Sequence, residues 1–152
     1  MLKQMTVSDP GFISPHSYLS TIYEMELDCP NYLHEARLTA QLMNDPAQIA
    51  QMTAESRAFA AGGCHRMLLA LETSRRRDLA SGKSNAITLA DIQSQLGKKE
   101  EALRTLREGV TRHDASIIYM RSQATLRSLH GEPKFQKLLA EIGLPPVTAA
   151  NP

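Results

Sequence analysis

Tryptophan is absent from this 152-residue chain, which also has only three Phe, four Tyr and two Cys. With so few aromatic residues, the core must be built mainly from Leu, Ile, Met and Ala, a composition typical of packed helices. The two cysteines, Cys29 and Cys64, allow one disulfide bond but do not form a disulfide framework. A chain of this length has room for one stable core, so we expect a single domain over residues 1–152.

The chain also lacks an excess of charge and a long apolar run. Lys and Arg total 17 against 16 for Asp and Glu, which gives a net charge of +1. This balance provides no electrostatic attraction to nucleic acids or membrane surfaces. No run approaches the roughly 18 apolar residues of a membrane span, and Met1–Met5 lacks the apolar stretch of a signal peptide. We expect a cytoplasmic location in a reducing compartment, with no direct nucleic-acid or membrane contact.

Proline and glycine divide the chain into pieces of helical length. Ser14–Pro15 and Asp45–Pro46 each place an N-cap residue before a proline, and Ser84 indicates another helix start. Gly62–Gly63 and Gly97 indicate helix ends. No segment shows the strict alternation expected of a strand. The sequence predicts helices over residues 15–27, 32–43, 46–61, 64–80, 84–96 and 98–110, then two or three shorter helices between residues 114 and 143.

Equivalent positions recur along these helices. Tyr23, Phe59 and Gln93 lie near the ends of successive first helices, spaced by 36 and then 34 residues. The inward positions of the second helices recur at spacings of 32 and 34, at Ala36, Leu68 and Ala102. A period close to 34, made of two helices and a short turn, is the signature of tetratricopeptide repeats. The middle repeat matches less well, because Glu72 stands where a large apolar residue is expected.

Two segments resemble the tetratricopeptide motif in detail. His16-x2-Leu19-Ser20-x2-Tyr23 is similar to its W-x2-L-G-x2-Y half, with His for Trp and Ser for Gly. The C-terminal run from Leu126-Arg127-Ser128-Leu129 through Glu132-Pro133-Lys134-Phe135 to Gly143-Leu144-Pro145 resembles the ending of many bacterial tetratricopeptide arrays. Such arrays are typically attached to a winged-helix DNA-binding domain or to a serine/threonine kinase domain.

The resemblance implies an all-α fold, an α-α superhelix of helical hairpins with C-terminal capping helices. Residues 1–112 would form the hairpins, residues 113–146 the cap, and residues 147–152 a flexible tail. The implied function is a protein–protein interaction scaffold or sensor part of a larger bacterial regulatory protein. It would bind a protein or peptide, would not be an enzyme, and would need no cofactor.

The N-terminal segment resembles the D-P-x-F turn that ends a hairpin in this family, because Asp9-Pro10-Gly11-Phe12 has that form. Residues 1–12 would then be a partial first repeat, in which Leu2 and Met5 have lost their partner helix. An exposed apolar edge favours pairing with a second copy of itself. This interpretation predicts a homodimer through the N-terminal hairpin, unless residues 1–7 fold back and cover the edge.

In such an array the first helices line a concave groove, which is the candidate partner-binding face. The packing positions place eight side chains there, namely Ser17, Thr21, Glu24, Thr53, Arg57, Ile87, Asp91 and Ser94. Arg57 is the only long cationic side chain of this set. The alternative is that these residues are merely exposed.

Patterns that indicate catalysis or metal binding are missing from the sequence. The five histidines form no ligand pattern with cysteine or with a carboxylate, so neither a metal site nor a catalytic residue is predicted. Gly62–Gly63 lacks the Lys-Ser/Thr of a phosphate loop. Arg75-Arg76-Arg77 fits a solvated helix end that complements the helix dipole, and the alternative is a contact with a phosphate or an acidic partner. The second hypothesis for the whole chain is a stand-alone helical protein that binds a small ligand or a metal.

Overall fold

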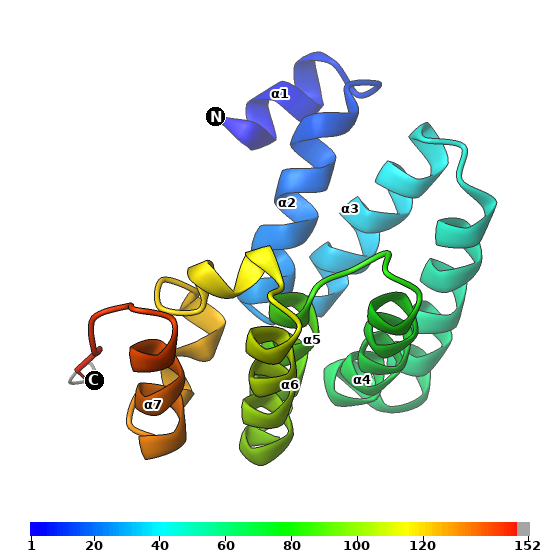
Figure 1. Cartoon of the computed structure of the whole chain (residues 1–152). Coiled ribbons are helices and arrows are strands. Elements are labelled where there is room, and N and C mark those ends of the chain that lie inside the picture. Colours follow the sequence, from blue (N-terminus) through cyan, green and yellow to red (C-terminus); the bar gives the residue numbers. More distant parts are fainter. Residues whose placement is uncertain (149–152) are drawn as a thin grey trace. The chain divides into compact units, whose positions relative to one another are not determined.

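The structure is a computed structural model that describes residues 1–148, and within that range every regular element is a helix (Figure 1). The predicted all-α class is therefore confirmed for this part of the chain. The elements in chain order are α1 (Leu2–Ser8), α2 (Ile13–Met25), α3 (Cys29–Leu42), α4 (Pro46–Ala80), α5 (Ala86–Gln95), α6 (Lys99–Thr111), the 3-10 helices η1 (Ala115–Tyr119) and η2 (Ala124–Leu129), and α7 (Pro133–Glu141).

The chain forms two compact units, Met1–Ala70 and Leu71–Pro152, so the division falls inside α4. In the first unit, α2 and α3 pack side by side as a helical hairpin, and α1 packs against α2. The face that α2 turns inward holds Pro15, His16, Leu19 and Tyr23 at helical spacing. Leu2 and Met5 of α1 are half-buried, so this short helix covers part of the N-terminal hairpin.

The second unit is built around the α5–α6 hairpin. Its core joins Ala90 of α5 and Leu106 of α6 to Met120, Leu126 and Leu129 of the 3-10 segment. Helix α7 closes this core with three side chains that are almost completely buried, Phe135, Leu138 and Leu139. Their burial is what a cap over the last hairpin requires, because a terminal element must cover an otherwise open apolar face.

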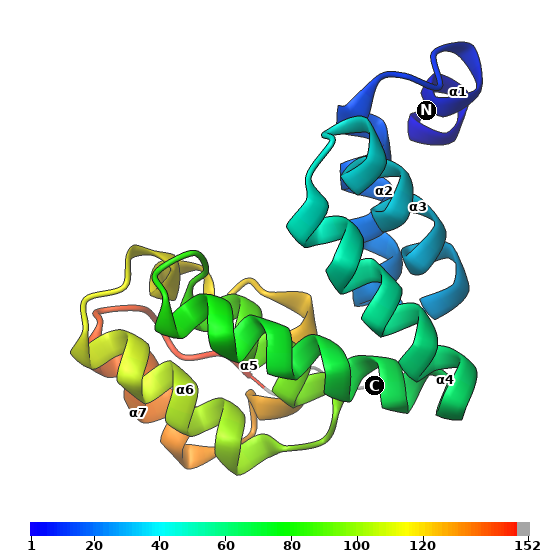
Figure 2. The ribbon, with the colours of Figure 1, turned by 90° about the vertical axis from the view of Figure 1, so that its right-hand side faces the viewer.

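The long helix α4 is interrupted at the position where the sequence predicts two separate helices. Gly62 and Gly63 have non-helical backbone angles, and Figure 2 shows the change of direction within α4. The φ angle of Gly63 is 67°, a value that side chains with a Cβ rarely adopt. The glycine pair therefore separates residues 46–61 from residues 64–80, as predicted.

The helices end in a recurring turn. After α2, the amide of Asp28 donates to Tyr23 O at 2.9 Å while Leu27 adopts a positive φ of 58°. The same six-residue closure follows α5, where Lys98 N donates to Gln93 O at 2.8 Å and Gly97 has φ 74°. These are Schellman turns, which satisfy carbonyl groups left open at a helix end. The glycine stop predicted at Gly97 is confirmed.

Of the three helix starts predicted from a cap residue, two are wrong and one is confirmed. Helix α2 begins at Ile13 after Phe12, so Pro15 lies inside the first turn, where its missing N–H leaves no helical bond unmade. Asn85, rather than Ser84, caps α5, because its side chain accepts a hydrogen bond from Thr88 N at 3.1 Å. At Pro46 the prediction is right, since Asp45 Oδ1 accepts from Ala47 N at 2.9 Å and Gln48 N at 3.1 Å.

The C-terminal segment is fixed as far as Val147. The Gln136 amide donates to Val147 O at 2.7 Å, and its oxygen accepts from Val147 N at 3.2 Å. The flexible tail expected over residues 147–152 therefore does not begin at Val147. Residues 149–152 of that expectation lie outside the described residues.

Candidate functional site

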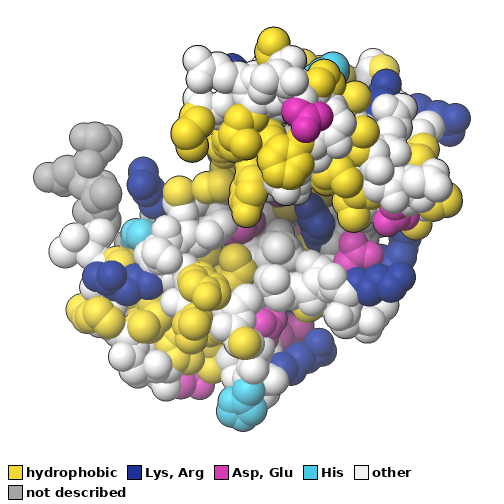
Figure 3. Space-filling view, turned by 90° about the horizontal axis from the view of Figure 1, so that it is seen from above, with side chains coloured by type: hydrophobic (Ala, Val, Ile, Leu, Met, Phe, Trp, Pro, Cys, Tyr) yellow, Lys and Arg dark blue, Asp and Glu magenta, His cyan; other side chains and the backbone are white. Residues whose placement is uncertain are grey.

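The outward face of α2 carries a row of large apolar side chains. Tyr18 is 64% exposed, and Ile22 and Met25 are each 39% exposed. Their spacing of four and then three residues puts them on one side of the helix. We refer to these three residues as the α2 stripe. Figure 3 shows that hydrophobic side chains gather in patches on the face drawn there.

Beside the α2 stripe runs a polar row that contains three of the predicted groove residues. Ser17 and Thr21 are exposed, and Glu24 is half-buried. The Thr21 hydroxyl donates to Ser17 O at 3.2 Å, so its hydrogen is used within the helix. The structure therefore brings Ser17, Thr21 and Glu24 together on α2, directly next to apolar side chains that the groove prediction did not include.

Thr53 and Arg57 lie in a different place, on the first part of α4. Both are exposed and line a surface cavity of about 480 Å³ between α3 and α4. Arg37 of α3 also lines this cavity and donates to Ser56 Oγ at 2.7 Å, which ties the two helices together. No residue of α2 is part of the lining, so the predicted groove of the first unit is divided between two surfaces.

The remaining three predicted residues, Ile87, Asp91 and Ser94, are buried inside the second unit. The loop and the 3-10 helices after α6 cover this face of α5. Asp91 accepts hydrogen bonds from Gln123 and Thr125, both at 2.6 Å. Ser94 Oγ donates to Thr125 O at 2.9 Å. Because the cap occupies the α5 face itself, these three side chains are not available to a partner in this structure.

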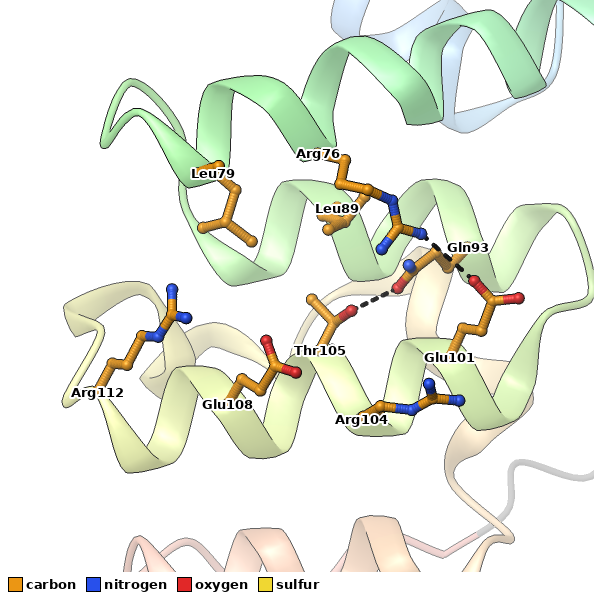
Figure 4. Close-up of a pocket in the computed structure, with 10 residues that line it drawn as sticks. Arg76, Leu79, Leu89, Gln93, Glu101, Arg104, Thr105, Glu108 and Arg112 are labelled. Carbon is orange, nitrogen blue, oxygen red and sulfur yellow. Dashed lines mark hydrogen bonds and ion pairs between the residues drawn. The ribbon is translucent and has the colours of Figure 1, made fainter.

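Sequence reasoning missed a polar cavity of about 360 Å³ in the second unit, between the end of α4, α5 and α6 (Figure 4). Arg76 donates to Glu101 across the cavity at 3.4 Å and to Glu72 at 2.8 Å. Gln93 and Thr105 are hydrogen bonded at 2.7 Å on its inner wall. Arg76 is thus engaged in two ion pairs rather than only solvating a helix end.

The contacts of Glu72 explain why a carboxylate can occupy a position of the middle repeat where an apolar residue is expected. Its side chain is buried but pairs with Lys98 Nζ at 2.7 Å as well as with Arg76. Burial by itself would raise the pKa of Glu72, and the two cations outweigh that effect and hold the pKa below its usual value. The residue therefore stays ionised at neutral pH and joins α4 to the α5–α6 turn.

The groups most suited to metal or redox chemistry serve as structural links. Cys29 and Cys64 are joined in a disulfide, with their Cα atoms 5.6 Å apart. His16 is buried and bonds Glu35 through Nδ1 at 2.6 Å. Within residues 1–148 no three His, Cys, Asp or Glu side chains form a group that could hold a metal ion. The described helices also include none that is long and apolar enough to cross a membrane.

Comparison of the chain with protein family models, with curated proteins and with solved structures gave no match.

Proposed function

We propose that this protein is an interaction module of the tetratricopeptide type, which binds an amphipathic helix of a protein partner along α2. The observation that carries this proposal is the α2 stripe, Tyr18, Ile22 and Met25, on a helix whose opposite face is fully packed. Tyr, Ile and Met are effective anchors at protein interfaces, and a helical row of such side chains matches the ridges of a second helix.

The polar row of Ser17, Thr21 and Glu24 beside the stripe supports this occupant. An amphipathic helix laid along α2 would meet apolar side chains in the centre of the contact and polar groups at its edge. These side chains offer hydrogen bonds and one acidic group but no nucleophile with an adjacent base. Binding rather than catalysis is the function that this face supports.

The backbone supports the repeat assignment independently of side-chain motifs. Leu27, Gly63 and Gly97 all have positive φ values, and each lies four residues after Tyr23, Phe59 or Gln93. A positive φ between the two helices of each proposed hairpin thus recurs at the spacing of the sequence motif. On this proposal the chain is the scaffold or sensor part of a larger bacterial regulator, attached to a DNA-binding or kinase domain.

Affinity capture with matched variants tests the proposal. The wild-type chain, Ile22→Glu and Ile118→Glu are used as bait, and each captured protein is then purified and titrated against all three. Ile118 is a suitable control because it is 59% exposed in η1 of the second unit. A charge placed in the centre of an apolar contact should weaken binding about tenfold or more, which corresponds to roughly 1.4 kcal/mol.

We expect a partner whose affinity falls for Ile22→Glu and is unchanged for Ile118→Glu, with cross-links that map to α2. Partners that bind both variants as tightly as the wild type, or whose cross-links map only to the second unit, would contradict binding on α2.

A further inference from the structure

A small cationic pocket lies in the second unit where η2 meets the C-terminal segment. It has a volume of about 300 Å³, and its lining consists of Arg121, Arg127, His130, Pro146, Val147 and Thr148. Arg121 lies on the turn between η1 and η2, and His130 follows the last residue of η2. We call this site the Arg121–His130 pocket.

His130 is the unusual member of the pocket. It is only 9% exposed, and its Nε2 atom is buried without a hydrogen-bond partner among the described residues. Its ring packs against Phe135, with centroids 5.4 Å apart, which fixes its orientation. Buried polar atoms are normally paired, so the unpartnered ring nitrogen is an unusual feature, and the residue that carries it is one of those that line the pocket.

The charge around His130 is positive and uncompensated. Burial first, and then the nearby charges of Arg127 and Arg121, lower the pKa of His130 below its usual value. The contacts from α7 are uncharged, since Phe135 stacks on the ring and the Gln136 amide donates to the backbone oxygen of His130. Arg121 Nε donates to Pro145 O at 3.2 Å, and no ion pair within the described chain engages Arg121 or Arg127.

The wall opposite these cations is positioned by the chain itself. The two hydrogen bonds between Gln136 and the backbone of Val147 hold the Pro146–Val147 segment in place. The pocket therefore combines two guanidinium groups and one imidazole with a small apolar surface. Such a set of donors suits an oxyanion that is attached to a small organic group.

We propose that the Arg121–His130 pocket binds a phosphate monoester through Arg121, Arg127 and His130. A phosphate offers three free oxygens and nearly two negative charges, which match two guanidinium groups and a ring nitrogen better than a carboxylate does. Pro146 and Val147 lie where the ester group meets the protein. The site is distant in sequence from the α2 stripe and does not depend on what binds there.

Bound phosphate has a definite effect on His130. The anion offsets the repulsion from Arg121 and Arg127 and accepts a hydrogen bond from the imidazolium, so it should raise the pKa of His130. Sulfate is the better probe for this measurement, because it is also a tetrahedral oxyanion and carries two negative charges throughout the pH range used. The two guanidinium groups keep their charge across that range.

The experiment uses the full chain and follows the His130 ring signals by NMR, assigned by their loss in His130→Gln. Sulfate and inorganic phosphate are titrated at constant ionic strength against chloride, with wild type, Arg127→Gln and the control Arg112→Gln. Arg112 is exposed and lines the other cavity of this unit, between α4, α5 and α6. Losing one charge-assisted hydrogen bond should weaken binding about tenfold.

We expect saturable shifts at His130, an upward shift of its pKa with sulfate, and a loss of affinity in Arg127→Gln but not in Arg112→Gln. Phenyl phosphate and a short phosphoserine peptide then distinguish a small ester from a phosphorylated protein as the source. Shifts that chloride reproduces at equal ionic strength, or that persist unchanged in Arg127→Gln, would overturn the site. Tighter binding of acetate than of phosphate would overturn its ligand class.

Discussion

At the scale of single residues, Gly109 shows how packing reverses an intrinsic preference. It lies inside α6 and is buried, and a Cβ atom added there would lie 2.7 Å from Ala86 Cβ and 2.6 Å from Ile117 Cδ1. Alanine is normally favoured over glycine inside a helix by about 1 kcal/mol. Here the missing side chain allows α5 and η1 to approach α6, so the glycine is a packing residue.

Gly109→Ala should therefore destabilise the protein, by about 1–3 kcal/mol as for other overpacked sites. Urea unfolding of the variant and the wild type measures this difference. Gly131→Ala is the control, because a Cβ atom at Gly131 would meet no atom within 4 Å. A Gly109→Ala variant as stable as the wild type would show that α6 does not pack closely against Ala86 and Ile117.

Asp114 is the second residue with a clear energetic role. Its carboxylate accepts hydrogen bonds from Ala86 N at 2.7 Å and Ser116 N at 2.9 Å, and so joins the end of α6 to the start of α5. Burial opposes ionisation of Asp114, but these backbone bonds outweigh it and lower the pKa. A carboxylate whose pKa is lowered by folding stabilises the protein above its unfolded pKa, and this contribution is lost as pH falls through the folded value.

Asp114→Asn should cost about 1–2 kcal/mol at neutral pH, because hydrogen bonds to a charged acceptor are stronger than neutral ones. The difference should shrink as the pH falls below the usual aspartate pKa of about 3.9, because the wild-type carboxylate is then progressively protonated. Urea unfolding of both proteins at several pH values measures this difference in the free energy of unfolding. A difference that is constant over the whole pH range would mean that the charge of Asp114 makes no contribution.

At the scale of elements, the sequence predicts helices well and their caps less well. Gly62–Gly63 and Gly97 mark real breaks because only glycine is readily accommodated at the positive φ of such turns. The turns after α2 and α6 have the same geometry, but Leu27 and His113 occupy the positive-φ position. Since these residue types carry no turn signal, their positive φ cannot be predicted from the sequence, although the helix ends predicted at residues 27 and 110 lie within two residues of the observed ends.

The cap can be tested as an element. Phe135, Leu138 and Leu139 complete the core of the second unit, so deleting residues 132–152 should expose that core. We expect the shortened chain to bind a hydrophobic dye and to aggregate.

A milder substitution separates this effect from a simple failure to fold. Phe135→Ala should lower stability by about 3–5 kcal/mol while the fold is kept. A truncated chain that remains monomeric, with unchanged dye binding, would show that α7 is dispensable.

At the scale of the whole molecule, the sequence predicts an all-helical chain, and every regular element within residues 1–148 is a helix. The prediction of the candidate site is less accurate. The periodic pattern identifies which helix face is exposed in an average array. Ser17 and Thr21 lie on such a face and are exposed in the structure. It cannot show that the segment after α6 returns over α5 and buries Asp91, because that depends on hydrogen bonds between residues about 30 positions apart.

The α2 stripe also bears on the state of association. Leu2 and Met5 are half-buried beside α2, so the apolar edge first expected there is partly covered, while Tyr18, Ile22 and Met25 stay open. Without a partner we expect self-association of the chain at high concentration through this stripe, which is identical on both copies. Sedimentation over a wide concentration range measures it. Ile22→Glu should abolish the association, and a wild type that is monomeric throughout would contradict the expectation.

The Cys29–Cys64 bond makes the backbone between these residues a closed ring that contains α3 and the first part of α4. A protease that cuts once inside this ring yields two fragments that travel together on a gel until a reductant is added. After a cut that follows Cys64, the two fragments separate on the gel even without a reductant. The fragment pattern with and without reductant therefore reports whether a nick falls within the ring, whatever the fold does after cleavage.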